Sequence, residues 1–387
     1  MVARAVYLDY AATTPVDERV AAAMAECLER DGHFGNPSST HRFGQAAARR
    51  VAAAREQIAQ RIGAGTGSIT FTSGATESDN LALQSVMLAN PGRHLITART
   101  EHKAVLDTAA ALARRGVAVT YLECATDGLI DLNELDAAFT DRTALVSIMH
   151  VNNETGVVQD IEAVGERCRA RGVLLHVDAA QSAGKLALDV ARWPVDMVSL
   201  TAHKIHGPKG VGALYVRPPL SLAPLLFGGE QERSLRPGTL PTHQIVGMGA
   251  AYALADPARE GPVLDSLRQR LWAGLSALAG VRRNGHPTRS APHVLNIAFP
   301  GVNGESLRHA IGEIAVSAGS ACNADNPESS HVLNAMGLSP ALAESSLRFS
   351  VGRYTTPEEI DYVLGRVAAE VGRLRQIAAG APNWCKS

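Results

Sequence analysis

The chain has 387 residues, which is more than the ~250–300 at which a single hydrophobic core stops growing, so we expect two domains. Hydrophobic residues make up 46% of the chain and charged residues 19%, which excludes an intrinsically disordered protein and argues against a membrane protein. The formal net charge of −1 provides no overall basic field, so we expect no direct binding of nucleic acid or of a membrane surface.

Cysteine usage and the N-terminus indicate the compartment. The five cysteines are an odd number without close Cys–Cys spacing, unlike a disulfide framework or a zinc site, so we predict a reducing compartment and no metal centre. The N-terminal stretch MVARAVYLDYAATTP meets an acid at Asp9 and lacks a signal-peptide core, and no run of about 18 apolar residues occurs. These features predict a cytoplasmic protein.

Short β-branched runs alternate with amphipathic helical stretches between about Ser68 and Pro218, which is the pattern of βαβ units around a mostly parallel sheet. A helix over 41–62 is expected before the first strand. The predicted strands cover residues 68–74, 94–100, 118–124, 144–153, 173–181, 197–204 and 211–217. Helices over 76–89, 104–115 and 161–171 connect them.

The pattern changes after Leu226. A Gly- and Arg-rich loop, FGGEQERSLRPGTLPT, is followed by helical stretches from about 242 and over 263–278. The strand-like segments VLNIAFP, EIAVSAGSA and SLRFSVG and a last helix over 357–377 then indicate a smaller α+β unit. We therefore predict a large α/β domain over 13–255 and a small α+β domain formed by 1–12 and 256–387.

Several predicted strands end in a cluster of polar residues. These clusters are Thr72-Ser73-Gly74, Glu101-His102, Asn152-Asn153-Glu154, Asp178 with Gln181, and Thr201-Ala202-His203-Lys204. In open α/β sheets ligands bind at the carboxyl ends of the strands, so we expect these clusters to converge on one crevice.

Lys204 and Asp178 suggest a carbonyl cofactor. Lys204 follows a strand and precedes the turn IHGPKG, so it is held rigidly and can form a Schiff base; taken alone, it also fits a solvated lysine beside a Gly-Pro turn. Asp178 ends the apolar run VLLHV and needs a cationic partner, which the protonated ring nitrogen of pyridoxal phosphate (PLP) provides. The alternative for Asp178 is a cap or a salt-bridged carboxylate.

Two further segments carry weaker signals. In FTSGATESDN, Gly74-Ala75-Thr76 opens a helix, whose free N–H groups and dipole favour an anion such as a phosphate, although the same pattern fits an ordinary capped turn. Cys322 lies in SAGSACNADNPESS, whose small polar residues indicate an accessible loop, so its thiol is a candidate nucleophile. For a lone cysteine the alternative is a small residue in a turn.

These segments together resemble the cysteine desulfurases of the NifS/IscS type, which are PLP enzymes of fold type I. The matching stretches, in the family's order, are NPSSTHRFG, FTSGATESDN, TEHKAV, HVNNETGVVQDI, HVDAAQSAGK, AHKIHGPKGVGALYVR, LRPGTLPT and SAGSAC. The resemblance implies a large domain with a mostly parallel seven-stranded sheet and a smaller α+β domain that carries the catalytic cysteine.

The resemblance also implies roles for the residues around the cofactor ring. Lys204 is similar in position to the Schiff-base lysine, and Asp178 to the partner of the pyridine nitrogen. Gln181 corresponds to the donor to the phenolic oxygen, and His102 to the residue that stacks on the ring.

Further positions match the phosphate, substrate and sulfur sites of the family. Thr239 would reach the phosphate in the neighbouring subunit of a homodimer, and Asn153 and Arg348 would hold the substrate, with Arg348 on its carboxylate. Cys322 would form the persulfide. The phosphate in the chain's own site would be bound by Ala75, Thr76, Thr201 and His203.

The resemblance therefore predicts conversion of L-cysteine to L-alanine, with sulfur passing from Cys322 to an acceptor protein in iron–sulfur cluster assembly or in thiolation of RNA, DNA or a cofactor. After SAGSAC the chain reads NADNPESS where the family commonly has Ser and Thr, which affects the choice of acceptor more than the chemistry. The alternatives are a selenocysteine lyase or another fold-type-I lyase or transaminase, in which Cys322 is dispensable. A non-enzymatic interaction protein would be expected to lose Lys204 or Asp178, and both are present.

Overall fold

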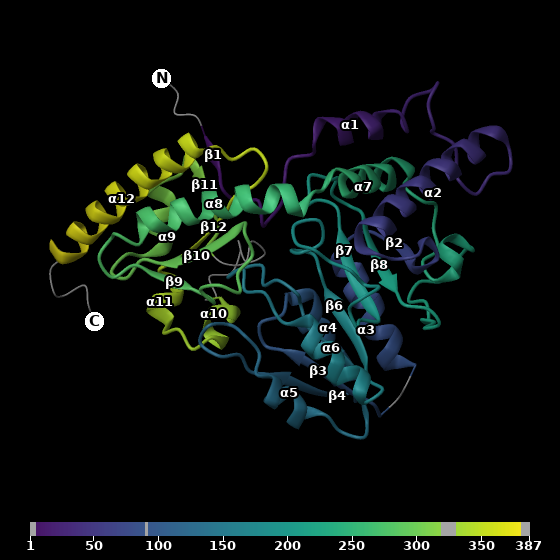
Figure 1. Ribbon diagram of the computed structural model, residues 1–387, viewed down its shortest axis with the longest axis horizontal. Helices are drawn as coiled ribbons and strands as arrows, with labels where there is room; N and C mark the ends of the chain where they lie inside the picture. Colours follow the sequence, from purple (N-terminus) through teal and green to yellow (C-terminus); the bar gives the residue numbers. More distant parts are fainter. Residues whose placement is uncertain (1–4, 90–91, 319–329, 381–387) are drawn as a thin grey trace.

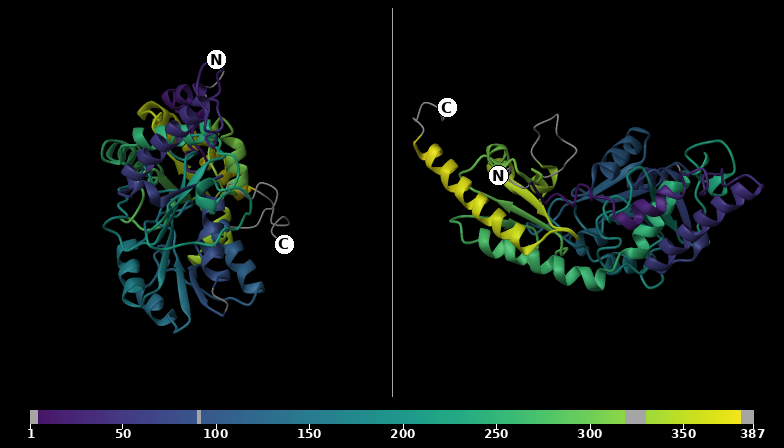
Figure 2. Two further views of the ribbon diagram at one scale, coloured as in Figure 1. Left: turned by 90° about the vertical axis from the view of Figure 1, so that its right-hand side faces the viewer. Right: turned by 90° about the horizontal axis from the view of Figure 1, so that it is seen from above.

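The computed structural model describes residues 5–89, 92–318 and 330–380. Two lobes lie side by side in it: one holds a large sheet with the middle of the chain, and the other holds two small sheets and the C-terminal helix (Figures 1 and 2). Most of the buried apolar side chains fall into separate clusters in the two lobes, so each lobe has a hydrophobic core of its own.

The large sheet has seven strands in the order β2-β8-β7-β6-β5-β3-β4. Strand β8 is antiparallel to both of its neighbours, and all other pairs are parallel, so the predicted mostly parallel sheet is confirmed. The strands are β2 (Ile69–Thr72), β3 (His94–Ala98), β4 (Ala118–Leu122), β5 (Thr143–Ser147), β6 (Leu174–Asp178), β7 (Met197–Thr201) and β8 (Gly212–Val216).

Helices cover both faces of this sheet, which is why strands such as β3 and β7 are buried along their whole length. Helices α3 (Ala75–Leu88) and α4 (Lys103–Arg114) pack on one face. The opposite face carries α2 (Arg42–Ile62), α6 (Ile161–Ala170) and α7 (Thr242–Leu254). The remaining elements of this lobe are α1 (Glu18–Ala25), α5 (Leu132–Ala138) and two short 3-10 turns, η1 (Thr66–Ser68) and η2 (Gln231–Ser234).

The second lobe has a three-stranded antiparallel sheet, in the order β12-β10-β9, and a two-stranded parallel sheet, β1-β11. These strands are β9 (Arg282–Asn284), β10 (Val294–Ala298), β12 (Ser346–Ser350), β1 (Val6–Tyr7) and β11 (Ile314–Ala315). Its helices are α8 (Pro257–Leu275), α9 (Gly304–Ala310), α10 (His331–Ala335), α11 (Pro340–Glu344) and α12 (Pro357–Gly380).

Two predicted elements of this lobe have different bounds. Helix α8 begins at Pro257 rather than at 263, because Asp256 caps it by accepting a hydrogen bond from the backbone N–H of Arg259 and proline is well tolerated in the first turn. Of the strand expected over 313–321, β11 covers Ile314–Ala315 within the part that the structure describes, residues 313–318. Within the described ranges, no helix is both long and apolar enough to cross a bilayer.

The N-terminal segment joins the two lobes. In β1, Val6 and Tyr7 pair with Ile314 and Ala315, and Val6 belongs to the apolar core of the second lobe. A few residues later, the backbone N–H of Thr14 donates to a carbonyl of the large lobe. The division into domains at 12/13 and 255/256 stays a prediction, and the shared core of β1 with the C-terminal part of the chain supports it.

Candidate active site

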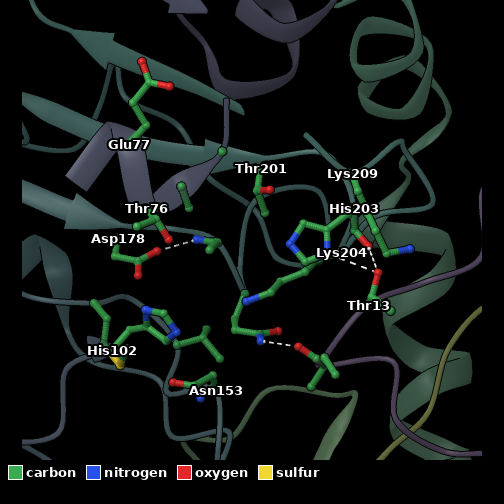
Figure 3. A pocket seen from close by; sticks show the side chains of 18 of the residues that line it. Thr13, Thr76, Glu77, His102, Asn153, Asp178, Thr201, His203, Lys204 and Lys209 are labelled. Carbon is green, nitrogen blue, oxygen red and sulfur yellow. Dashed lines mark hydrogen bonds between the residues drawn. The ribbon is translucent and has the colours of Figure 1, made fainter. Parts of the chain in front are cut away.

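A cavity of about 490 Å³ lies at the carboxyl ends of β2, β5, β6 and β7 (Figure 3). Of the predicted site residues, Thr239 does not line it and is exposed at the surface, and Cys322 falls outside the described residues. The others all line it: Ala75, Thr76, His102, Asn153, Asp178, Gln181, Thr201, His203, Lys204 and Arg348. The expected convergence of strand-end clusters is therefore observed, while the role of each residue stays a prediction.

One end of the cavity is suited to an anion. Helix α3 starts directly after β2, and its N-cap, Gly74, has no side chain to occupy the first N–H groups of the helix. Those donors and the helix dipole are therefore available to a phosphate group. Gly212 on β8 makes this arrangement possible, because a Cβ atom there would lie only 2.6 Å from the backbone of Gly74 and from the carbonyl oxygen of Leu200.

Buried acids lie at the ring-nitrogen end of the predicted site. Asp178 is the last residue of β6, is 5% exposed, and accepts a hydrogen bond of 2.8 Å from the backbone N–H of Ala180. Burial, together with the nearby Asp178, raises the pKa of both Asp79 and Glu101 well above the usual range of carboxyl groups. Of these three buried acids, only Asp178 lines the cavity.

Two histidines border the cavity in their uncharged form. His102 is the N-cap of α4, and its Nδ1 atom accepts a hydrogen bond of 3.1 Å from the backbone N–H of Ala104, which places the proton of the neutral ring on Nε2. Burial lowers the pKa of His102. Burial, with the charge of Lys204, also lowers the pKa of His203 to about 4. An uncharged His102 is suited to stacking on an aromatic ring.

The turn that carries Lys204 is anchored to the N-terminal segment. The carbonyl oxygen of His203 accepts hydrogen bonds of 2.9 Å from both the backbone N–H and the hydroxyl of Thr14, and the ring Nδ1 of His203 lies 3.1 Å from the hydroxyl of Thr13. Gln181 donates from Nε2 to the carbonyl oxygen of Ala11 at 2.8 Å. This segment was not predicted to line the site, because nothing local in its sequence shows that it crosses the large lobe.

Arg348 enters the cavity from β12 in the second lobe and is 1% exposed. Its Nη1 donates to the carbonyl oxygen of Asn153 at 2.8 Å. Its Nη2 donates to Oδ1 of Asp9 at 2.8 Å and to the hydroxyl of Ser317 at 3.0 Å. Sequence reasoning missed Asp9 and Ser317, whose only signals are an acid two residues after β1 and the first serine of SAGSAC.

The donor set fits PLP. An uncapped helix N-terminus suits the phosphate, a buried carboxylate at the end of β6 suits a protonated ring nitrogen, and the amine of Lys204 borders the same space. The described residues contain no group of three or more His, Cys, Asp or Glu side chains arranged to hold a metal ion.

Comparison with known proteins agrees with this chemistry. The model of the class-V aminotransferase family matches residues 6–363. The chain belongs to this family, among its cysteine desulfurases of the NifS/IscS type. It is 54% identical to cysteine desulfurase IscS of Proteus mirabilis over 98% of this chain and 95% of that protein. The resemblance predicted from the sequence motifs is confirmed, and with it the dependence of the enzyme on PLP.

Solved structures show the same fold. A NifS-like protein superposes with a TM-score of 0.89 at 36% identity and covers 95% of this chain and 99% of its own. The structure described as SspA in complex with cysteine has a TM-score of 0.81 at 39% identity and covers 91% of this chain and all of its own (100%). The predicted PLP fold type I is therefore confirmed.

Proposed function

We propose that this cysteine desulfurase binds PLP at Lys204 and L-cysteine beside it, releases L-alanine and keeps the sulfur as a persulfide on Cys322. The observation that carries the proposal is that Lys204 and Asp178 from the large lobe and Arg348 from the second lobe border one cavity. Each is the residue type that a PLP enzyme acting on an amino acid needs: an amine for the carbonyl, an acid for the ring nitrogen and a guanidinium for the substrate carboxylate.

PLP, when bound, supplies an electron sink for the bonds at the substrate Cα. The residues of this chain hold it in place. The N-terminus of α3 with Thr76, Thr201 and His203 binds the phosphate, Asp178 compensates the charge of the ring nitrogen, and the neutral ring of His102 stacks on the ring face.

Substrate chemistry is divided between the two lobes. Arg348 binds the carboxylate of L-cysteine and so orients its Cα. The amine of Lys204 takes the proton from that Cα. Cys322 attacks the substrate sulfur as a thiolate, so that a new S–S bond forms while the Cβ–S bond breaks, and the electron pair of the broken bond remains with carbon. Protonation of that carbon, together with return of a proton from the amine of Lys204 to Cα, gives L-alanine.

We place the enzyme in the cytoplasm as a homodimer that delivers sulfur to an acceptor protein. Thr239, exposed and outside the cavity, would contact the phosphate in the partner subunit. Phe227, in the same loop, is 88% exposed, and such an apolar side chain is expected to be covered in a dimer. The net charge of −1 supports a protein rather than a nucleic acid as the acceptor.

The Cys322→Ser variant tests the sulfur step. It should still bind PLP and L-cysteine, seen as the absorbance change of the bound cofactor, but should release no sulfide in the presence of a reductant. Cys124→Ser is a matched control, because the thiol of Cys124 is half-buried and does not line the cavity, so its turnover should equal that of the wild type. Normal turnover of Cys322→Ser would refute the persulfide mechanism and favour a lyase.

A further inference from the structure

The guanidinium of Arg348 is almost fully engaged by the protein itself. Nη2 donates to Oδ1 of Asp9 and to the hydroxyl of Ser317, and that hydroxyl in turn donates to the same Oδ1 atom at 2.9 Å. Nη1 donates one hydrogen to the carbonyl oxygen of Asn153. The buried Nε–H, by contrast, has no hydrogen-bond partner among the described residues. Apart from Nη2, which already contacts Asp9 and Ser317, the donors left for a ligand are Nε–H and one hydrogen of Nη1.

These two donors do not lie on the same edge of the guanidinium plane. An arginine grips a carboxylate with two parallel hydrogen bonds, either from Nη1 and Nη2 or from Nε and Nη2. Arg270 shows the second geometry in this protein, since its Nε and Nη2 donate to the two carboxylate oxygens of Asp361 at 2.8 and 2.6 Å. Both geometries need Nη2, so Arg348 can grip a substrate with two bonds only if Asp9 or Ser317 releases it.

We propose that Asp9 is a stand-in for the substrate carboxylate: it occupies Nη2 of Arg348 until the carboxylate of L-cysteine takes its place. The proposal rests on the proposed role of Arg348 as the carboxylate site. It makes Asp9 a positioning residue, which acts on substrate binding through Arg348 rather than by touching the reacting atoms.

Asp9 is better suited to leave than Ser317. The backbones of Ser317 and Arg348 are joined by two hydrogen bonds, of 3.2 and 2.7 Å, which hold the serine hydroxyl in place. The side chain of Asp9 is 19% exposed, whereas that of Arg348 is 2% exposed, so the aspartate can turn toward water while the arginine stays. Exchange of one carboxylate for another also keeps the buried guanidinium paired in both states, which avoids the cost of an unpaired buried charge.

Asp9→Asn tests the exchange, because a neutral amide is a weaker competitor for Nη2 than a carboxylate. In the PLP-loaded enzyme, the Kd for L-alanine should fall by about three- to tenfold, measured from the absorbance of the bound cofactor. Binding of cysteamine, which has the amine and thiol of the substrate but no carboxylate, should not change. If Asp9 had a purely structural role, its substitution would change the binding of both ligands together. The ratio of the Kd values for L-alanine and cysteamine is therefore the decisive measurement.

A control variant and a second variant complete the test. Asp17→Asn removes another buried carboxylate that pairs with two arginines, Arg19 and Arg353, and it should leave both Kd values unchanged. Ser317→Ala keeps Asp9 but removes one acceptor of Nη2 and the hydroxyl that donates to Asp9, so L-alanine should bind about twofold more tightly, again without an effect on cysteamine. If Asp9→Asn does not fold, this second variant carries the test.

Failure of the exchange can be distinguished from failure of the proposed function. If L-alanine binds to Asp9→Asn no more tightly than to the wild type, the proposed exchange of carboxylates is overturned. If Asp9→Asn does not fold, the same result with Ser317→Ala overturns it. Arg348→Lys tests the carboxylate site itself. This variant should weaken the binding of L-alanine more than the binding of cysteamine. Equal effects on the binding of both ligands would show that Arg348 does not bind the carboxylate.

Discussion

The two lobes build their parts of the site in different ways. In the large lobe, a strand and the few residues after it supply each group, as β6 supplies Asp178 and β7 supplies Lys204. The second lobe contributes Arg348, and that side chain is held by Asp9, which lies 339 positions away in the sequence. The cofactor half of the site is thus assembled locally and the substrate half through long-range contacts. Variants in the two halves should therefore have different kinetic signatures.

The largest effect is expected from Lys204→Ala. Loss of the amine removes both the attachment of the cofactor and the base for the Cα proton, so kcat should fall by roughly 10³- to 10⁴-fold. The absorbance of the purified protein should lose the band of the lysine-bound cofactor. Lys103→Ala is the control, since Lys103 opens α4 outside the cavity and its loss should leave the band intact. A retained band in Lys204→Ala would show that another residue carries the cofactor.

Asp178→Asn should act on turnover rather than on substrate affinity. The amide cannot compensate the charge of the ring nitrogen, so we expect kcat to fall by roughly 10²- to 10³-fold with little change in KM. Asp79→Asn is a matched control: Asp79 is a buried acid that does not line the cavity, so kcat should change less than about threefold. Equal effects of the two variants would contradict the assignment of Asp178.

Arg348→Lys, in contrast to Asp178→Asn, should act on substrate affinity rather than on turnover. Lysine keeps the charge but cannot form two parallel hydrogen bonds, so KM for L-cysteine should rise by roughly 10- to 100-fold, and kcat should change less. Arg270→Lys, in an exposed pair with Asp361, should leave KM within about twofold of the wild type. If Arg348→Lys lowers kcat as strongly as Asp178→Asn, the division between cofactor and substrate halves is wrong.

The smallest expected effect is a pH dependence of the free energy of unfolding that arises from a residue in the large lobe. Burial lowers the pKa of His150 to about 4, against about 6.5 in an unfolded chain. Between these values the unfolded state binds more protons, so the free energy of unfolding should decrease as the pH falls from 6.5 to 4, by at most about 1.4 kcal/mol per pH unit for this group. His150→Phe, which keeps a ring against Trp193, should lower this slope in urea titrations. An unchanged slope would contradict the prediction.

Sequence reasoning found the cofactor half because its signals are local. Strand periodicity placed Asp178 and Lys204 at strand ends, and the topology of a parallel sheet then brings such ends to one edge. The motif resemblance supplied the family, the fold and the expectation that Arg348 belongs to the site. The raised pKa values of Asp79 and Glu101 follow from their depth in the core, which periodicity alone does not measure.

The substrate half depends on contacts that no local pattern contains. Asp9 meets Arg348 because β1 pairs with β11 and because Asp9 itself bridges to Ser350 at the end of β12. Local propensity does not specify pairing between the two ends of a chain. The short helices α10 and α11 were not fully predicted either, since each has only five residues and no amphipathic period to read.

The path of the N-terminal segment affects the thermal unfolding of the protein. Residues 6–14 begin in the core of the second lobe, pass the guanidinium at Asp9 and end on the lysine turn of the large lobe. Bound PLP restrains one end of this N-terminal segment, and the two-stranded sheet β1-β11 restrains the other. Calorimetry of the PLP-bound enzyme should therefore record a single cooperative unfolding transition, and removal of PLP should separate this transition into two.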